Sequence, residues 1–258
     1  MRLPAELRLQ IYGYLFPARR VEVLRLIQQK PANPKRKGYR LYHRQLQPRD
    51  PVTQSTPRCA AAGPAGFGCL TPFPLALVFS CKDIYHDALC SLYSHTQFVF
   101  NSAKSVARFL KLTPPAAQAA VRHVELNYQM YNEPRLVAFR VFKHRCDLAW
   151  YSVCKAVADS FTSLHTLHVR MNVRDWPIRL ALDERWALPL MAFARKNLLY
   201  ADVNLAMVMF SQERLHDTAR RIEQAIMHPA AYQAKEASRI AIDIMAHTKA
   251  LKSLRLIF

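Results

Sequence analysis

Histidine and cysteine would carry the most specific chemistry in this chain, because both side chains bind transition metals. His165 and His168 are three residues apart in a segment with strand-like alternation, so their side chains point to opposite faces and do not share an ion. Cys81, His86 and Cys90 lie in a helical pattern, where the step from Cys81 to His86 turns about 140° around the axis. Closed zinc sites need four convergent ligands, so we predict no metal site.

Signatures of catalysis are also missing from the sequence. There is no G-x-S-x-G motif and no H-E-x-x-H motif, and acidic residues such as Asp147, Asp159 and Asp183 are scattered rather than paired. All five glycines precede residue 69, so the rest of the chain cannot supply a glycine-rich loop that binds phosphate through backbone N–H groups. We therefore predict no catalytic residues, no cofactor and a protein that is not an enzyme.

The formal net charge of +19 makes anion binding the next candidate. Residues 18–58 contain 11 basic and 2 acidic residues, a local charge of +9, and Tyr39 and Tyr42 lie among the cations. Within this segment, the candidate contacts to phosphate are Lys35, Arg36, Lys37, Arg40 and Arg44. The competing interpretation is a solvated loop whose charge supports solubility or acts as a nuclear-import address.

The cysteines and the apolar runs indicate a compartment. The six cysteines form no C-x-x-C pair, and several lie among apolar residues, a placement typical of buried free thiols in a reducing environment. No stretch approaches 18 apolar residues without charge, and the N-terminus has no signal-peptide run. We expect an intracellular protein, cytoplasmic or nuclear, with no membrane partner.

Two helical segments dominate the N-terminal part. In residues 3–16, the apolar residues Leu3, Leu7, Ile11 and Leu15 recur every four positions, which predicts a helix with one apolar stripe. Residues 75–93 predict a second helix, with a stripe through Leu77, Cys81, Ile84, Ala88 and Leu92. Between them we predict a hairpin of residues 21–27 with 39–43, and a disordered, basic, proline-rich insertion over about residues 30–74.

A weak repeat organises the rest of the chain. The pattern apolar-x-x-apolar-x-apolar occurs four times, at separations of 43, 36 and 51 residues, and each copy predicts a short strand. The copies are Val121, Val124, Leu126; Leu164, Leu167, Val169; Tyr200, Val203, Leu205; and Leu251, Leu254, Leu256. The segments between the copies have helical stripes, including one through Phe142, Cys146, Ala149, Val153 and Val157 and one through Ala237, Ile240, Ile244 and Met245. We predict a helix-rich α/β fold, with an N-terminal module of residues 1–112 and an irregular leucine-rich-repeat-like layer of residues 113–258.

The two N-terminal helices carry a family resemblance. Leu3-Pro4-x-Glu6-Leu7-x-x-x-Ile11-Tyr12-x-x-Leu15 resembles the first helix of an F-box, and residues 77–93, with their Cys81-Lys82 pair, resemble the later part of that module. Together with Thr96-Gln97-Phe98-Val99-Phe100 and the helix that follows, they are similar to a large family of fungal F-box-like proteins of uncharacterised function.

The resemblance implies a non-enzymatic interaction module, and a substrate receptor of a cullin-RING ubiquitin ligase. The residues implied to dock a Skp1-type adaptor are Leu3, Pro4, Glu6, Leu7, Ile11 and Leu15. The C-terminal layer would then present a protein target of unknown identity. Two alternatives stay open at this point: the stripe packs on residues 75–93 instead of a partner, or the protein associates with nucleic acid through residues 19–58.

Overall fold

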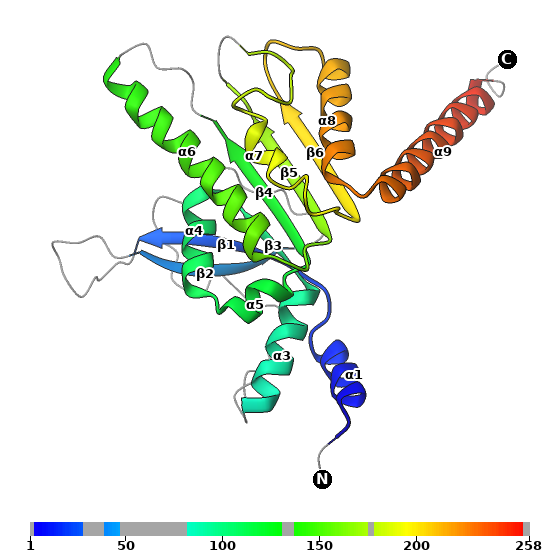
Figure 1. Cartoon of the computed structure of the whole chain (residues 1–258). Coiled ribbons are helices and arrows are strands. Elements are labelled where there is room, and N and C mark those ends of the chain that lie inside the picture. Colours follow the sequence, from blue (N-terminus) through cyan, green and yellow to red (C-terminus); the bar gives the residue numbers. More distant parts are fainter. Residues whose placement is uncertain (1–2, 28–38, 47–81, 131–136, 175–177, 255–258) are drawn as a thin grey trace.

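The computed structural model describes residues 3–27, 39–46, 82–130, 137–174 and 178–254, in which eight helices and six strands are found (Figure 1). The strands are β1 (Arg19–Ile27), β2 (Tyr39–Leu46), β3 (Thr96–Phe100), β4 (His123–Gln129), β5 (Thr166–Asn172) and β6 (Tyr200–Ala206). The helices are α1 (Ala5–Leu15), α3 (Lys82–His95), α4 (Ala103–Leu112), α5 (Pro115–Ala120), α6 (Val137–Ser160), α7 (Leu188–Met191), α8 (Gln212–Ile226) and α9 (Pro229–Leu254). The predicted helix-rich α/β class is confirmed.

The six strands form one sheet in the order β2-β1-β3-β4-β5-β6. β1 and β2 pair antiparallel, with Val23 opposite His43, so the predicted hairpin is confirmed. Strands β1, β3, β4, β5 and β6 are parallel to one another, and they lie side by side in the order in which they occur in the chain. Strands from both predicted regions, residues 1–112 and 113–258, belong to this one sheet.

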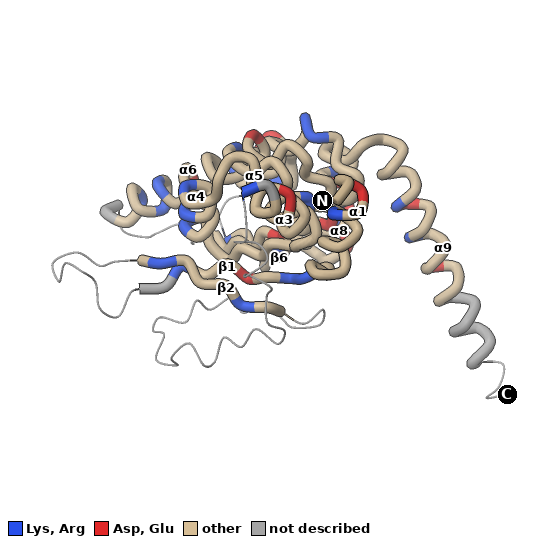
Figure 2. The backbone as a smooth tube through the Cα atoms, turned by 90° about the horizontal axis from the view of Figure 1, so that it is seen from below, with Lys and Arg blue, Asp and Glu red and all other residues tan. Residues whose placement is uncertain are grey.

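Strand alternation separates an apolar face from a polar face. In β4, Val124 and Leu126 are fully buried in the core, and the alternate residues Glu125 and Asn127 point to the other side. Residues of α4, α6 and α8 pack with the apolar side of the strands in one core. Among the described helices, α4, α6 and α8 cover this face, and none lies over the opposite face, which is lower in Figure 2. We call that opposite side the open face.

Helix boundaries follow from local chemistry. Ser102 caps α4, because its Oγ accepts a hydrogen bond of 3.1 Å from the Ser105 N–H, and Ser211 caps α8 in the same way. α4 ends at Leu112, and Pro115 occupies the first turn of α5, where its missing N–H costs nothing.

The buried stripe of α6 differs from the prediction in its first half. Val153 and Val157 are buried as predicted, but Phe142 and Ala149 are exposed, and Trp150 and Cys154 are buried with the two valines. In the N-terminal half of α6, the Tyr128 hydroxyl of β4 donates to the Cys146 carbonyl at 3.4 Å, and Lys143 is buried in place of Phe142.

After α8 the chain forms a single parallel bridge at Met227 and then enters α9 instead of a seventh strand. The Leu198 N–H donates to the Ile226 carbonyl at 3.1 Å, and the His228 N–H donates to the Leu198 carbonyl at 2.8 Å. Leu198 and Met227 form an isolated parallel bridge, and Pro229 then starts α9. A strand at this position would pair with β6, the last strand of the sheet, and α9 replaces it.

Side chains satisfy backbone groups at the outer edge of β6. Glu223, buried in α8, accepts a hydrogen bond of 2.9 Å from the Val203 N–H, and Lys235 in α9 donates to the Ala201 carbonyl. Glu223 also forms ion pairs with Lys235 at 2.8 Å and with Arg239 at 3.1 Å. These contacts hold α8 and α9 at an edge that would otherwise expose unpaired backbone groups.

The predicted strand through Leu251, Leu254 and Leu256 is therefore wrong, because α9 continues to Leu254. The three-residue step from Leu251 to Leu254 fits a helix as well as the repeat. α9 projects away from the sheet (Figure 1), and its predicted stripe residues Ile240, Ile244 and Met245 are exposed. Leu256 lies outside the described residues.

Candidate docking surface on the first helix

A small apolar cluster holds α1 against α3. Tyr12 of α1 and Phe16, the residue that follows the helix, are buried together with Ala88 of α3, and the two aromatic rings are stacked with centroids 6.1 Å apart. Leu15 and three residues of α3 pack around them: Ile84, Tyr85 and Leu92. The predicted stripe of the second helix is thus confirmed at Ile84, Ala88 and Leu92, and Leu77 and Cys81 lie outside the described residues.

An ion pair adds a polar contact between the same two helices. Arg8 Nη1 lies 2.6 Å from Asp87 Oδ2, and both side chains are about one-third exposed, at 30% and 37%. Pairs at this level of exposure contribute at most about 1 kcal/mol. The contact orients α1, while the buried aromatic rings supply most of the attachment.

The predicted docking stripe faces away from α3. Leu3 is 53% exposed, Leu7 46% and Ile11 41%, and Pro4 and Glu6 beside them are exposed as well. Only Leu15 turns inward, because it lies next to Phe16 at the end of α1 where the two helices meet. The stripe is therefore not the surface that packs on the described part of the second helix, residues 82–95.

The sequence contained a signal for the true packing face. Tyr12 and Phe16 are four residues apart, so they lie on one side of the helix, about 100° around from Leu7 and Ile11 or further. Tyr14, which appears beside the predicted stripe in the helical projection, is exposed. The four-residue spacing is the same for the predicted stripe and for Tyr12 with Phe16, and the structure shows that Tyr12 and Phe16 are buried.

The basic candidates fall into two groups. Arg44 in β2 lies 2.5 Å from the carboxylate of Glu22, which is fully buried in β1, so this cation has a structural partner. Arg40 is exposed near the start of β2. Lys35, Arg36 and Lys37 lie outside the described residues.

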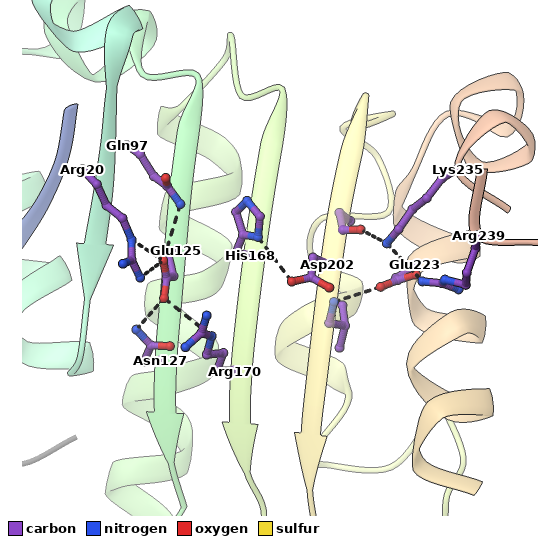
Figure 3. Close-up of polar contacts among 12 residues, drawn as sticks. Arg20, Gln97, Glu125, Asn127, His168, Arg170, Asp202, Glu223, Lys235 and Arg239 are labelled. Carbon is purple, nitrogen blue, oxygen red and sulfur yellow. Dashed lines mark hydrogen bonds and ion pairs between the residues drawn. The ribbon is translucent and has the colours of Figure 1, made fainter. Parts of the chain in front are cut away.

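A polar network on the open face was not predicted from the sequence. Its centre is Glu125 in β4, which accepts from Arg20 at 2.8 Å, from Gln97 at 3.4 Å and from Asn127 at 3.3 Å (Figure 3). Arg170 of β5 lies 3.8 Å away from it. Acidic residues at outward positions of otherwise apolar strands were the available signal, because a buried carboxylate needs partners from neighbouring strands.

A histidine–carboxylate pair continues the open face toward β6. His168 Nδ1 lies 3.4 Å from Asp202 Oδ2, and the hydrogen bond to His168 lowers the pKa of Asp202 despite the opposing effect of burial (Figure 3). Burial, followed by the charges of His165 and Arg122, lowers the pKa of His123. Among the described residues, no three His, Cys, Asp or Glu side chains converge as metal ligands would.

The cysteines differ in burial. Cys154 is buried in α6, and burial raises the pKa of its thiol well above the ordinary value. Cys146 is half-buried, and all three described cysteines are free. The expectation of burial is wrong for Cys90, because it lies on the solvent side of α3.

None of the described helices is both long enough and apolar enough to cross a membrane.

The comparisons with known proteins place the chain in a family. No curated protein and no solved structure matches it. A family model described as a domain of unknown function, DUF7730, matches residues 1–190 of the 258. The match includes the first helix and its partner α3, the hairpin, and the strands up to β5. The chain therefore belongs to the DUF7730 family.

Proposed function

We propose that this chain is a non-enzymatic protein-interaction module that docks a Skp1-type adaptor through α1 and acts as an F-box-like substrate receptor of a cullin-RING ubiquitin ligase. One observation carries the proposal: α1 is attached through Tyr12 and Phe16, so Leu3, Leu7 and Ile11 remain exposed. A helix attached by one face presents the other in a fixed orientation, which lowers the entropy cost of binding.

The exposed stripe has the chemistry of a helix that binds in a groove. Leu3, Leu7 and Ile11 are spaced by four residues, the spacing with which an amphipathic helix inserts apolar anchors into a partner. Glu6 in the first turn lies near the positive end of the helix dipole and stays exposed beside the stripe, as expected of a polar rim. Each anchor that becomes buried contributes about 25 cal/mol per Å² of apolar surface.

The sheet supports the second half of the proposal. An open face made of consecutive parallel strands is the kind of extended surface on which repeat proteins bind targets. The α1 surface and the open face belong to different elements, so an adaptor and a target have separate places to bind. In this arrangement no residue of the chain performs a chemical step.

Co-purification with a Skp1-type protein tests the adaptor proposal. We expect the double variant Leu7→Asp, Ile11→Asp to bind at least about 100-fold more weakly, because docking would bury two unpaired carboxylates in an apolar groove. The matched control is Val208→Asp, Met209→Asp, which places the same charges on exposed apolar residues of the loop after β6.

Only if α1 is the docking surface does the α1 variant lose binding to the Skp1-type protein while the control variant keeps it. Background recovery of the wild type, or equal recovery of the wild type and the α1 variant, contradicts the proposal. Leu15 is left unchanged in this test, because it packs against α3 and its replacement would disturb the fold.

A further inference from the structure

A hydrogen-bonded chain crosses the open face and ends at an unsatisfied oxygen. Arg44 donates to Glu22, the Asn101 side chain also donates to Glu22, and Asn127 Nδ2 donates to Asn101 Oδ1 at 2.9 Å. The same Nδ2 donates to Glu125 Oε1 at 3.3 Å. The series joins strands β2, β1 and β4 through Asn101, the residue that follows β3.

This series fixes the orientation of the Asn127 amide. Its nitrogen lies between two acceptors, Asn101 Oδ1 and Glu125 Oε1, so exchanging the amide oxygen and nitrogen would bring oxygen against oxygen on both sides. Asn101 is held in turn by its donation to Glu22. The Asn127 oxygen consequently points away from the network.

That oxygen, Asn127 Oδ1, is buried and accepts no hydrogen bond from the described residues. The residue is only 7% exposed, and a buried acceptor without a donor costs about 1–3 kcal/mol. Asn127 lines a shallow, partly open hollow together with Asn101, Tyr128, Gln129 and Arg170. In natural structures an unsatisfied acceptor of this kind commonly marks the place of a ligand or a water.

The second polar group of the hollow is a cation with unused donors. The Arg170 side chain is 54% exposed, and its Nε lies 3.8 Å from Glu125 Oε1, beyond hydrogen-bonding distance. Figure 3 shows Arg170 and Asn127 side by side on neighbouring strands. An arginine side chain this exposed can rotate and admit a ligand to Asn127 Oδ1.

We propose that this hollow binds a primary carboxamide, the side chain of a glutamine or asparagine in a partner peptide. The carboxamide N–H donates to Asn127 Oδ1, and its C=O accepts from the Arg170 guanidinium. One planar group thus satisfies the orphaned acceptor and the unused donors together.

Competing ligand groups satisfy only half of the site. A carboxylate or a phosphate offers acceptors alone, so it leaves Asn127 Oδ1 without a donor and meets the charge of Glu125. An ammonium group offers donors alone and is repelled by Arg170. The inference does not depend on the α1 surface, because the hollow is formed by β4, β5 and Asn101, the residue that follows β3.

NMR titration of the full chain with acetyl-Gly-Gln-Gly-N-methylamide, whose glutamine side chain is its single primary carboxamide, tests the proposal. We expect saturable shifts of the Asn127 side-chain N–H and Arg170 Nε–H signals. The peptides acetyl-Gly-Glu-Gly-N-methylamide and acetyl-Gly-Met-Gly-N-methylamide, which contain no primary carboxamide, should bind at least about tenfold more weakly, as expected when one hydrogen bond is lost. The variant Arg170→Met, at an exposed position, should lose a similar factor.

The matched control is Gln224→Leu, which removes an exposed amide of α8, on the other side of the sheet, and should leave the affinity unchanged. Three outcomes overturn the proposal. If no signal shifts saturably, the hollow holds water only, and if the three peptides bind with equal affinity, the protein recognises the peptide backbone. The proposal also fails if a single-stranded oligonucleotide shifts these signals and the glutamine peptide does not. Because the wild-type signals report binding directly, the test does not depend on a variant that might misfold.

Discussion

At the scale of single residues, Tyr12 and Phe16 determine which face of α1 is buried. They pack on Ala88, and their burial leaves Leu7 and Ile11 in solvent. Sequence periodicity finds an apolar stripe in α1 but cannot choose between two faces of similar hydrophobicity, because the choice depends on the surface that α3 offers. The buried carboxylates of Glu22 and Glu125 escaped prediction for the same reason, since their partners come from strands distant in the chain.

His123 gives a residue-scale prediction for pH dependence. Its pKa is lowered in the folded protein, mainly by burial, so below the ordinary value of 6.5 the unfolded chain binds more protons than the folded one. Stability is therefore lost as pH falls below this value. The variant His123→Gln should lose less stability than the wild type between about pH 7 and about pH 5 in urea unfolding.

The control for this prediction is His216→Gln, which replaces an exposed histidine of α8 and should retain the pH dependence of the wild type. If His123→Gln loses as much stability as the wild type when the pH falls, other groups cause the loss.

At the scale of elements, the repeat was predictable and its end was not. Three copies of the pattern form β4, β5 and β6, because alternating apolar residues specify one buried face of a strand. The fourth copy lies in α9, which Pro229 starts after a single bridge residue of a new strand. The pattern could not reveal that Glu223 and Lys235 already occupy the edge of β6.

Replacing the edge carboxylate should destabilise this end of the sheet. Glu223→Ala leaves the Val203 N–H without its acceptor and removes the shared partner of Lys235 and Arg239, so we expect a loss of about 3 kcal/mol in the free energy of unfolding. Chemical denaturation measures this value. Glu213→Ala, in the exposed first turn of α8, is the control, with an expected change within about 0.5 kcal/mol. Equal small losses in both variants would exclude the edge role.

At the scale of the whole molecule, the helix-rich α/β class followed from the alternation of apolar periods along the chain. The sequence did not indicate that the hairpin would join the parallel strands, because the register of β1 against β3 is set by contacts about 75 residues apart. The continuous sheet brings Arg20 of the N-terminal part to Glu125 of the C-terminal part. The division into regions at residue 112 stays a prediction.

Joining both parts in one sheet also separates two surfaces. α1 precedes β1, lies away from the sheet and has an exposed apolar face (Figure 1). The open face carries the polar side chains of β1 to β6 (Figure 3). This separation fits the proposed role of a receptor that connects an adaptor with a target.

Hydrogen exchange measured by mass spectrometry, with and without a Skp1-type protein, tests whether α1 docks the adaptor. A docked partner stabilises the helix against local opening, so exchange should slow in peptides from residues 3–15 and stay unchanged in β4, β5 and β6. Unchanged exchange in residues 3–15 at saturating Skp1-type protein, or protection confined to the sheet, would contradict the account.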